Sequence, residues 1–118
     1  MKQILSDLAR LEHIREAIAY VETFLETKTK EDFLSEPILR FAVERQLEII
    51  GEAANHLSEN ILQQAPEIEW RKIIAFRNLI VHEYFGVDLE LVWSVVQHKI
   101  PQLGVSVNSL ILNLKTNI

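Results

Sequence analysis

Residues 70–85 read WRKIIAFRNLIVHEYF, a stretch typical of a helix with one apolar face. Its larger apolar residues recur at the three- and four-residue spacings of an α-helix: Trp70, Ile73, Ile74, Ile80 and Val81. Gly86 follows, and glycine commonly ends helices. We therefore expect a helix over about residues 68–85.

The same periodicity extends through the rest of the chain. A first helix is expected over about residues 3–27, with apolar residues at Ile4, Leu8, Leu11, Ile14, Ile18, Val21 and Leu25. A second should start near Glu31, or near Ile38 after Pro37, and run to about Leu62. Gly51 within it is expected where a neighbouring helix packs closely. Asp88 should cap a helix over residues 89–99, and Pro101 should open a last, weaker helix.

Length and composition agree with this pattern. The 118 residues include only three glycines and three prolines, too few for a sheet protein with many tight turns. No repeat or linker divides the chain. We predict an all-α, single-domain antiparallel bundle of four to five helices spanning residues 1–118, which dimerises through the third helix.

Composition also excludes several classes of protein. The chain has no cysteine, so it has neither disulfides nor thiolate chemistry. We see no signal peptide and no apolar run long enough for a membrane span, and we expect a cytoplasmic protein. The formal net charge of −5 argues against a broad nucleic-acid-coating surface. Any RNA contact must therefore come from a local basic cluster or from a site shared by two subunits.

Arg77 interrupts the apolar face of the third helix. It lies seven positions after Trp70, where helical spacing calls for another apolar residue. A guanidinium stays charged, so it must meet carboxylates or face a wet cleft. One interpretation is a structural ion pair with Glu44, Glu48 or Glu52. The other is an anion site, because the planar guanidinium can donate two hydrogen bonds to one phosphate.

Three further residues complete the candidate site. His82 is the plausible proton carrier, since histidine titrates near neutral pH. Asn78 lies one turn before it and could orient its ring. Each could also be an ordinary surface residue, and Tyr84 could simply complete the apolar stripe.

The spacing of Arg77 and His82 raises a geometric difficulty. Five residues along an ideal helix turn their side chains apart by roughly 140°. They could converge if the helix loosens near Gly86. They could also converge if a two-fold partner places the same segment opposite, and we favour this dimer.

The order of these residues resembles the signature of HepT-like toxins in the HEPN superfamily: Arg77, four residues, His82, one residue, Tyr84. The flanking stretches 47–54, 85–88 and 92–93 are also similar to that family, over about residues 5–102. The resemblance implies a dimeric helical bundle and a ribonuclease that needs neither metal nor cofactor. It further implies that Arg77 binds the scissile phosphate, that His82 acts as general acid or base, and that Asn78 assists positioning. The expected products are a 2′,3′-cyclic phosphate and a 5′-hydroxyl.

The family also implies partners. HepT-like toxins are usually paired with an MNT-type antitoxin, a minimal nucleotidyltransferase that transfers AMP to the signature tyrosine, here Tyr84. We therefore expect a toxin of a type II- or type VII-like toxin–antitoxin pair, with RNA, a second copy and the nucleotidyltransferase as partners. Contact with DNA or a membrane is not expected.

Two competing functions stay open. The chain could be a non-catalytic dimer that binds a nucleotide or the nucleotidyltransferase. It could also be a structural dimer whose Arg77 is sealed by Glu48 or Glu52. The remaining histidines, His13, His56 and His98, share no metal-ligand spacing and are interpreted as surface or boundary residues.

Overall fold

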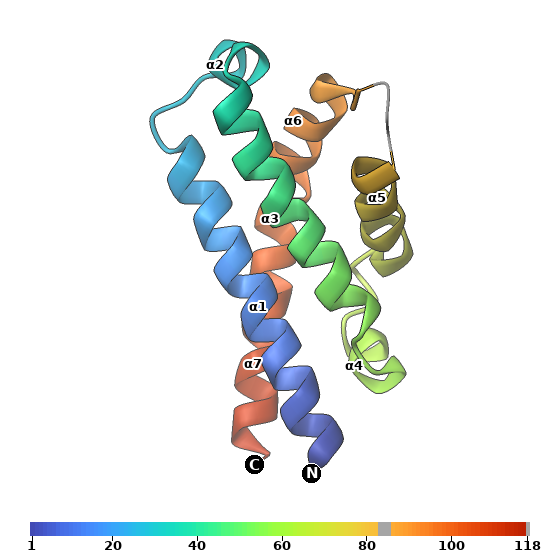
Figure 1. Cartoon of the computed structure of the whole chain (residues 1–118). Helices are drawn as coiled ribbons and strands as arrows, with labels where there is room; N and C mark the ends of the chain where they lie inside the picture. The colour runs from blue at the N-terminus through green and yellow to red at the C-terminus, as the bar shows by residue number, and fades with distance from the viewer. Residues whose placement is uncertain (83–85, 118) are drawn as a thin grey trace.

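The computed structural model describes residues 1–82 and 86–117, with only the backbone of His82. Within these residues it contains seven helices and no strand (Figure 1). They are α1 (Lys2–Leu25), α2 (Lys30–Ser35), α3 (Pro37–Asn55), α4 (Glu59–Gln64), α5 (Trp70–His82), α6 (Leu89–His98) and α7 (Ile100–Thr116). The all-α fold is confirmed, but the described residues form seven helices and not the four to five expected.

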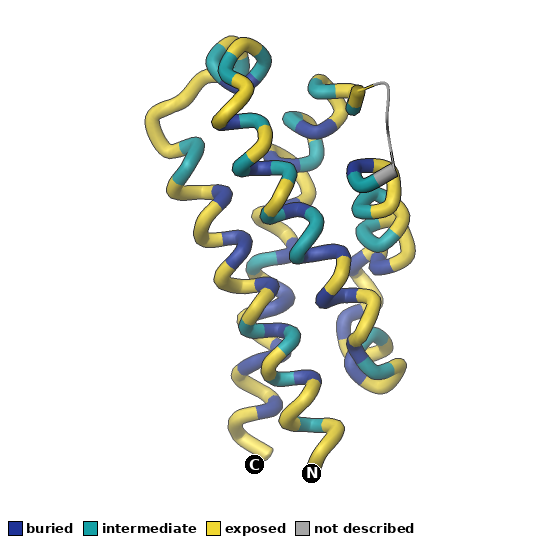
Figure 2. Tube along the Cα trace, in the orientation of Figure 1, coloured by how far each residue is buried: buried dark blue, intermediate teal, exposed yellow. Residues whose placement is uncertain are grey.

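The central helix of the bundle is α3, which packs against α1 on one side and α5 on the other. Figure 2 shows buried positions recurring along α1 and α3, as expected for amphipathic helices. The predicted stripe of α1 supplies the buried residues Leu11, Ile14, Ile18 and Val21. Removing this apolar surface from water is the main force that holds α1 to its neighbours.

The predicted second helix is divided into α2, α3 and α4. Glu36 is extended, with φ −107° and ψ 100°, because the ring of Pro37 disfavours helical geometry in the preceding residue. Pro37 then fits the first turn of α3, where no N–H is needed. After α3 ends, Ser58 is again extended and its hydroxyl accepts from the Ile61 N–H at 3.4 Å, which starts α4.

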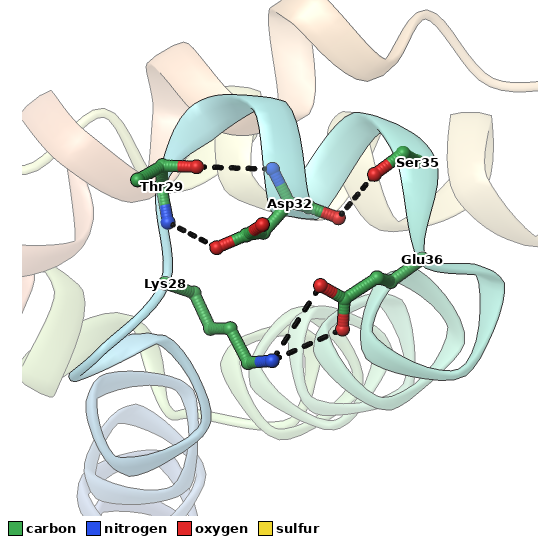
Figure 3. Close-up of polar contacts among 5 residues, drawn as sticks. All are labelled: Lys28, Thr29, Asp32, Ser35 and Glu36. Carbon is green, nitrogen blue, oxygen red and sulfur yellow. Dashed lines mark hydrogen bonds and ion pairs between the residues drawn. The ribbon is translucent and has the colours of Figure 1, made fainter.

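Side chains at the start of α2 hold the turn between α1 and α3. The Thr29 hydroxyl accepts from the Asp32 N–H at 3.1 Å, and Asp32 Oδ2 accepts from the Thr29 N–H at 3.0 Å (Figure 3). This reciprocal pair is a capping box. It lowers the pKa of the Asp32 carboxyl, chiefly through the backbone hydrogen bond from Thr29. Lys28 spans the turn to Glu36 at 3.1 Å.

A buried carboxylate fixes the opposite end of the α1–α3 pair. Asp7 of α1 is only 4% exposed. Its Oδ1 accepts from the Ser58 N–H at 2.9 Å, and its Oδ2 accepts from the Ser58 hydroxyl at 2.6 Å. These bonds satisfy the buried charge and tie the start of α1 to the start of α4.

The C-terminal half adds two helices behind α3. Asp88 caps α6 as expected, with Oδ1 accepting from the Leu91 N–H at 3.2 Å. Gly86 has a φ of +111°, a backbone conformation that favours glycine. The last helix was predicted to be weaker, but α7 is continuous and buries a full apolar stripe against α1. None of the described helices is both long and apolar enough to cross a membrane.

Candidate functional site

Arg77 reaches the surface of α3 because Gly51 has no side chain. A Cβ placed on Gly51 would lie 2.1 Å from Arg77 Cβ and 2.7 Å from its Cγ. Such distances are far inside van der Waals contact, so only glycine permits this approach. The close packing expected at Gly51 is confirmed, and the side chain it accommodates is Arg77.

The guanidinium of Arg77 is held from two sides. Its Nη2 lies 2.9 Å from Oε2 of Glu52, and its Nη1 donates to Oδ1 of Asn78 at 2.7 Å. Its Nε is buried without a hydrogen-bond partner in the described part of the chain. The group is therefore oriented by a carboxylate and an amide while part of its donor capacity stays unused.

Glu52 connects Arg77 to a histidine. Its second oxygen, Oε1, lies 2.9 Å from Nε2 of His56, the residue that follows the last residue of α3. The four side chains form the chain His56–Glu52–Arg77–Asn78, which runs from α3 to α5. Glu52 engages both neighbours at once, so it limits the rotation of the guanidinium.

Arg77 opens onto a pocket of about 200 Å³ between α1, α3 and α5. The lining residues are Arg10, His13, Arg45, Glu48, Ile49, Glu52, Ala53 and Arg77. The Arg77 side chain keeps 29% of its surface exposed. Of the three carboxylates considered from the sequence, Glu52 is the one that pairs with Arg77, but it does not seal the guanidinium from solvent.

Of the other three candidate residues, the structure describes the side chain of Asn78 alone. Asn78 is exposed on α5 and contacts Arg77. His82 is the last residue of α5, and its side chain lies outside what the structure describes. Tyr84 lies outside the described residues. The structure thus brings Arg77 and Asn78 together, while the roles assigned to His82 and Tyr84 stay predictions.

Sequence reasoning gave no site role to Arg10, Arg45, His13 or His56; the two histidines are exposed, as expected, but His13 lines the Arg77 pocket and His56 contacts Glu52. Arg10 and His13 lie one turn apart on α1, and Arg45 lies one turn before Glu48 on α3. This spacing was visible in the sequence. Their convergence with Arg77 depends on how α1, α3 and α5 are set against one another, which no single-helix pattern gives.

A second pocket, on the other side of α5, is mainly apolar. Ile73 and Phe76 face an apolar pocket of about 180 Å³ that is also lined by residues of α3, α6 and α7. The pocket contains neither Arg77 nor Asn78. Among the described residues, no group of three or more His, Asp or Glu side chains is placed to hold a metal ion. Of the two ion pairs that α5 makes in the described residues, Arg77–Glu52 lies at the pocket between α1, α3 and α5, whereas Lys72–Glu69 lies at this apolar pocket.

Fold and site together define a class: an all-α protein with an oriented arginine at a basic pocket on its third long helix. The family model described as "Ribonuclease HepT-like" matches residues 14–110. The chain belongs to this HepT-like family.

Individual relatives agree with the family model. The chain is 43% identical over 93 residues to a probable ribonuclease HepT from Thermococcus cleftensis, covering 79% of this chain and 84% of the relative. It is 33% identical over 101 residues to a provisionally named RNase from Caldanaerobacter subterraneus, covering 86% and 90%.

The name of a longer relative gives a second activity beside the RNase. The Methanocaldococcus jannaschii protein named as a gamma-glutamylcyclotransferase and provisional RNase is 36% identical over 107 residues, which cover 91% of this chain and 48% of that protein. The chain thus spans about half of this relative. No solved structure matches the chain significantly.

Proposed function

We propose that the chain is the toxin of a toxin–antitoxin pair and an endoribonuclease that cleaves RNA without a metal ion. The observation that carries this proposal is the Arg77 guanidinium, held by Glu52 and Asn78 and open to a basic pocket. A pre-oriented cation stabilises charge that develops on a phosphate without having to reorganise during the reaction. Membership of the HepT-like family makes RNA the expected source of that phosphate.

The proposed reaction takes its nucleophile from the substrate. The ribose 2′-hydroxyl oxygen attacks the adjacent phosphorus and loses its proton, and the bond from phosphorus to the 5′-oxygen breaks. The leaving oxygen takes up a proton, which gives a 2′,3′-cyclic phosphate and a 5′-hydroxyl. Arg77 stabilises the charge on the phosphate oxygens, and His82 accepts or donates one of the two protons. An internal nucleophile of this kind needs no metal-activated water.

A second copy of the chain is part of the proposal. Positions five residues apart on an ideal helix, such as 77 and 82, diverge by roughly 140°, and α5 is continuous from Trp70 to His82. A two-fold arrangement of α5 would let Arg77 of one subunit face His82 of the other. The cleft between them would suit a polymer substrate.

The test is RNA cleavage in EDTA by the wild-type protein and by His82→Ala purified identically. Wild type should cleave to cyclic-phosphate ends, and the variant should lose about 100-fold or more of the rate. Equal cleavage by both proteins, or cleavage by neither, rejects the enzyme.

We further propose that AMP transfer to Tyr84 by a minimal nucleotidyltransferase silences the toxin. The tyrosine oxygen would attack the α-phosphorus of ATP and release pyrophosphate. Each AMP would add a negative charge and bulk within two residues of His82, and both would oppose RNA entry. Intact mass after co-expression with the neighbouring gene's product should increase by whole AMP units, and Tyr84→Phe should abolish the increase.

One alternative is a non-catalytic dimer, in which the Arg77–Glu52 ion pair orients the guanidinium for binding and not for a reaction. Such a protein would still bind the nucleotidyltransferase or a nucleotide. Tight partner binding without any RNA turnover would support that alternative over the nuclease.

A further inference from the structure

The pocket beside Arg77 is lined by basic side chains that the proposed reaction does not use. Arg10 and His13 enter from α1, and Arg45 enters from α3. Arg10 and His13 lie three positions apart on a continuous helix, so they lie on the same face. With Arg77 from α5, three helices therefore direct cationic or N–H-bearing groups toward one cavity.

The carboxylates of the pocket are already engaged. Glu52 contacts Arg77 and His56, and Glu48 lies 3.7 Å from Arg45. Within the described residues, Arg10 has no carboxylate at ion-pair distance, although it is half-buried. Three guanidinium groups thus face two carboxylates, which leaves a local positive excess on a chain whose net charge is −5.

Arg45 can move toward a ligand at little cost. Its side chain is 66% exposed, and its contact with Glu48 is long. Exposed ion pairs of this kind are weak and screened by salt. A phosphate entering the pocket would replace that contact with a bidentate hydrogen bond, which is stronger and directional.

We propose that Arg10, His13 and Arg45 form a second phosphate subsite, which holds the RNA phosphate next to the one bound at Arg77. The inference rests on the proposed function, because it takes RNA as the ligand. The subsite fixes the direction in which the strand leaves Arg77, across the pocket toward α1. It also supplies the local basic cluster that an acidic protein needs to hold a polyanion.

The test measures binding of a fluorescein-labelled single-stranded RNA by anisotropy over a range of salt concentrations. All proteins carry His82→Ala, so that the probe stays intact. Arg10→Gln and Arg45→Gln should each weaken binding about threefold to tenfold at low salt. Each should also reduce the slope of log K against log salt by about 0.7, the value for one single-strand phosphate contact.

Arg15→Gln is the matched control. Arg15 lies on the same helix, is exposed and does not line the pocket. Its substitution changes net charge by the same amount and should leave the slope unchanged. Arg10→Lys should keep the slope, because the positive charge remains.

The outcomes separate the subsite from the nuclease. Equal slopes in the pocket variants and in Arg15→Gln, or no RNA binding at all, would overturn the subsite. Cleavage by wild type would still leave the ribonuclease in place. Loss of binding to a purified protein partner in the pocket variants, with RNA binding unchanged, would also overturn the proposal. Arg45 is too exposed for Arg45→Gln to act by unfolding the chain.

Discussion

Gly51 of α3 and Arg77 of α5 are so close that a methyl group on the glycine would occupy the position of the arginine stem, 2.1 Å from its Cβ. This packing contact also positions a side chain of the candidate site. It brings the Arg77 side chain onto the face of α3 that carries Glu52, where the guanidinium finds its ion-pair partner at 2.9 Å. The orientation of Arg77 therefore depends on the absence of a side chain at Gly51, the residue before Glu52.

Gly51→Ala should destabilise the protein by about 1–3 kcal/mol, since α3 and α5 must separate to admit the methyl group. Gly104→Ala is the matched control, because a Cβ there lies 3.8 Å from Ile18, an ordinary contact. That change should stabilise α7 by about 0.5–1 kcal/mol. Thermal unfolding of the two variants and of wild type measures both changes in stability. A Gly51→Ala protein at least as stable as wild type would contradict the close packing.

Glu52→Gln should lower the cleavage rate about tenfold, because the guanidinium loses the charge that orients it. The same change should strengthen RNA binding at low salt, since the pocket gains positive charge. Glu48→Gln is the control: it lies in the same pocket but near Arg45 instead. It should raise low-salt affinity without the loss of kcat. Equal kcat in both variants would show that Glu52 does not position Arg77.

A mixed dimer tests whether Arg77 and His82 meet across two subunits. One subunit carries Arg77→Gln and its partner carries His82→Ala, with different tags for purification. If the pairs form between subunits, one of the two sites is intact, and the mixed dimer should recover about half of the wild-type activity. If the pairs form within a subunit, both sites are broken and the mixed dimer stays as inactive as its parents.

Stability should depend on pH through Glu44. Burial raises the pKa of its carboxyl above the ordinary 4.5, opposed by Arg40 and assisted by Glu48. The folded state thus holds the proton more tightly than the unfolded chain, so this contribution to stability is complete below about pH 4.5 and is lost as pH rises through the folded pKa.

Glu44→Gln keeps the neutral form at every pH. Its melting temperature should exceed that of wild type near pH 7, and the gap should close as the pH falls toward about 4. Glu16→Gln, on the exposed face of α1, should show no such gap. A constant difference between Glu44→Gln and wild type across this range would exclude the burial effect.

Much of the fold followed from periodicity, because burial follows helical spacing. The stripe on α1 and the cap at Asp88 are present as predicted. Both starts considered for the second helix are present, since α2 begins at Lys30 and α3 at Pro37, but the pattern did not predict that Glu36 and Ser58 would divide this stretch into three helices. The role of Asp7 could not be predicted from the sequence, because its hydrogen-bond partner Ser58 lies 51 residues away.

The site could be predicted only in part. Arg77 stood out because it broke an apolar stripe, and Glu52 was one of three carboxylates considered for it. The choice among the three depends on Gly51, which sets the depth at which α5 meets α3. Arg10 and Arg45 occupy ordinary polar positions on their own helices, and only the packing of three helices brings them to one pocket.

The central claim is that the fixed charge at position 77 drives RNA cleavage. The most direct measurement is the single-turnover rate on one RNA in EDTA for wild type, Arg77→Lys and Arg77→Gln. We predict a loss of about 100- to 1,000-fold for Arg77→Gln and a smaller loss for Arg77→Lys, which keeps the charge without the planar fork. Wild-type cleavage that persists undiminished in Arg77→Gln would contradict the claim.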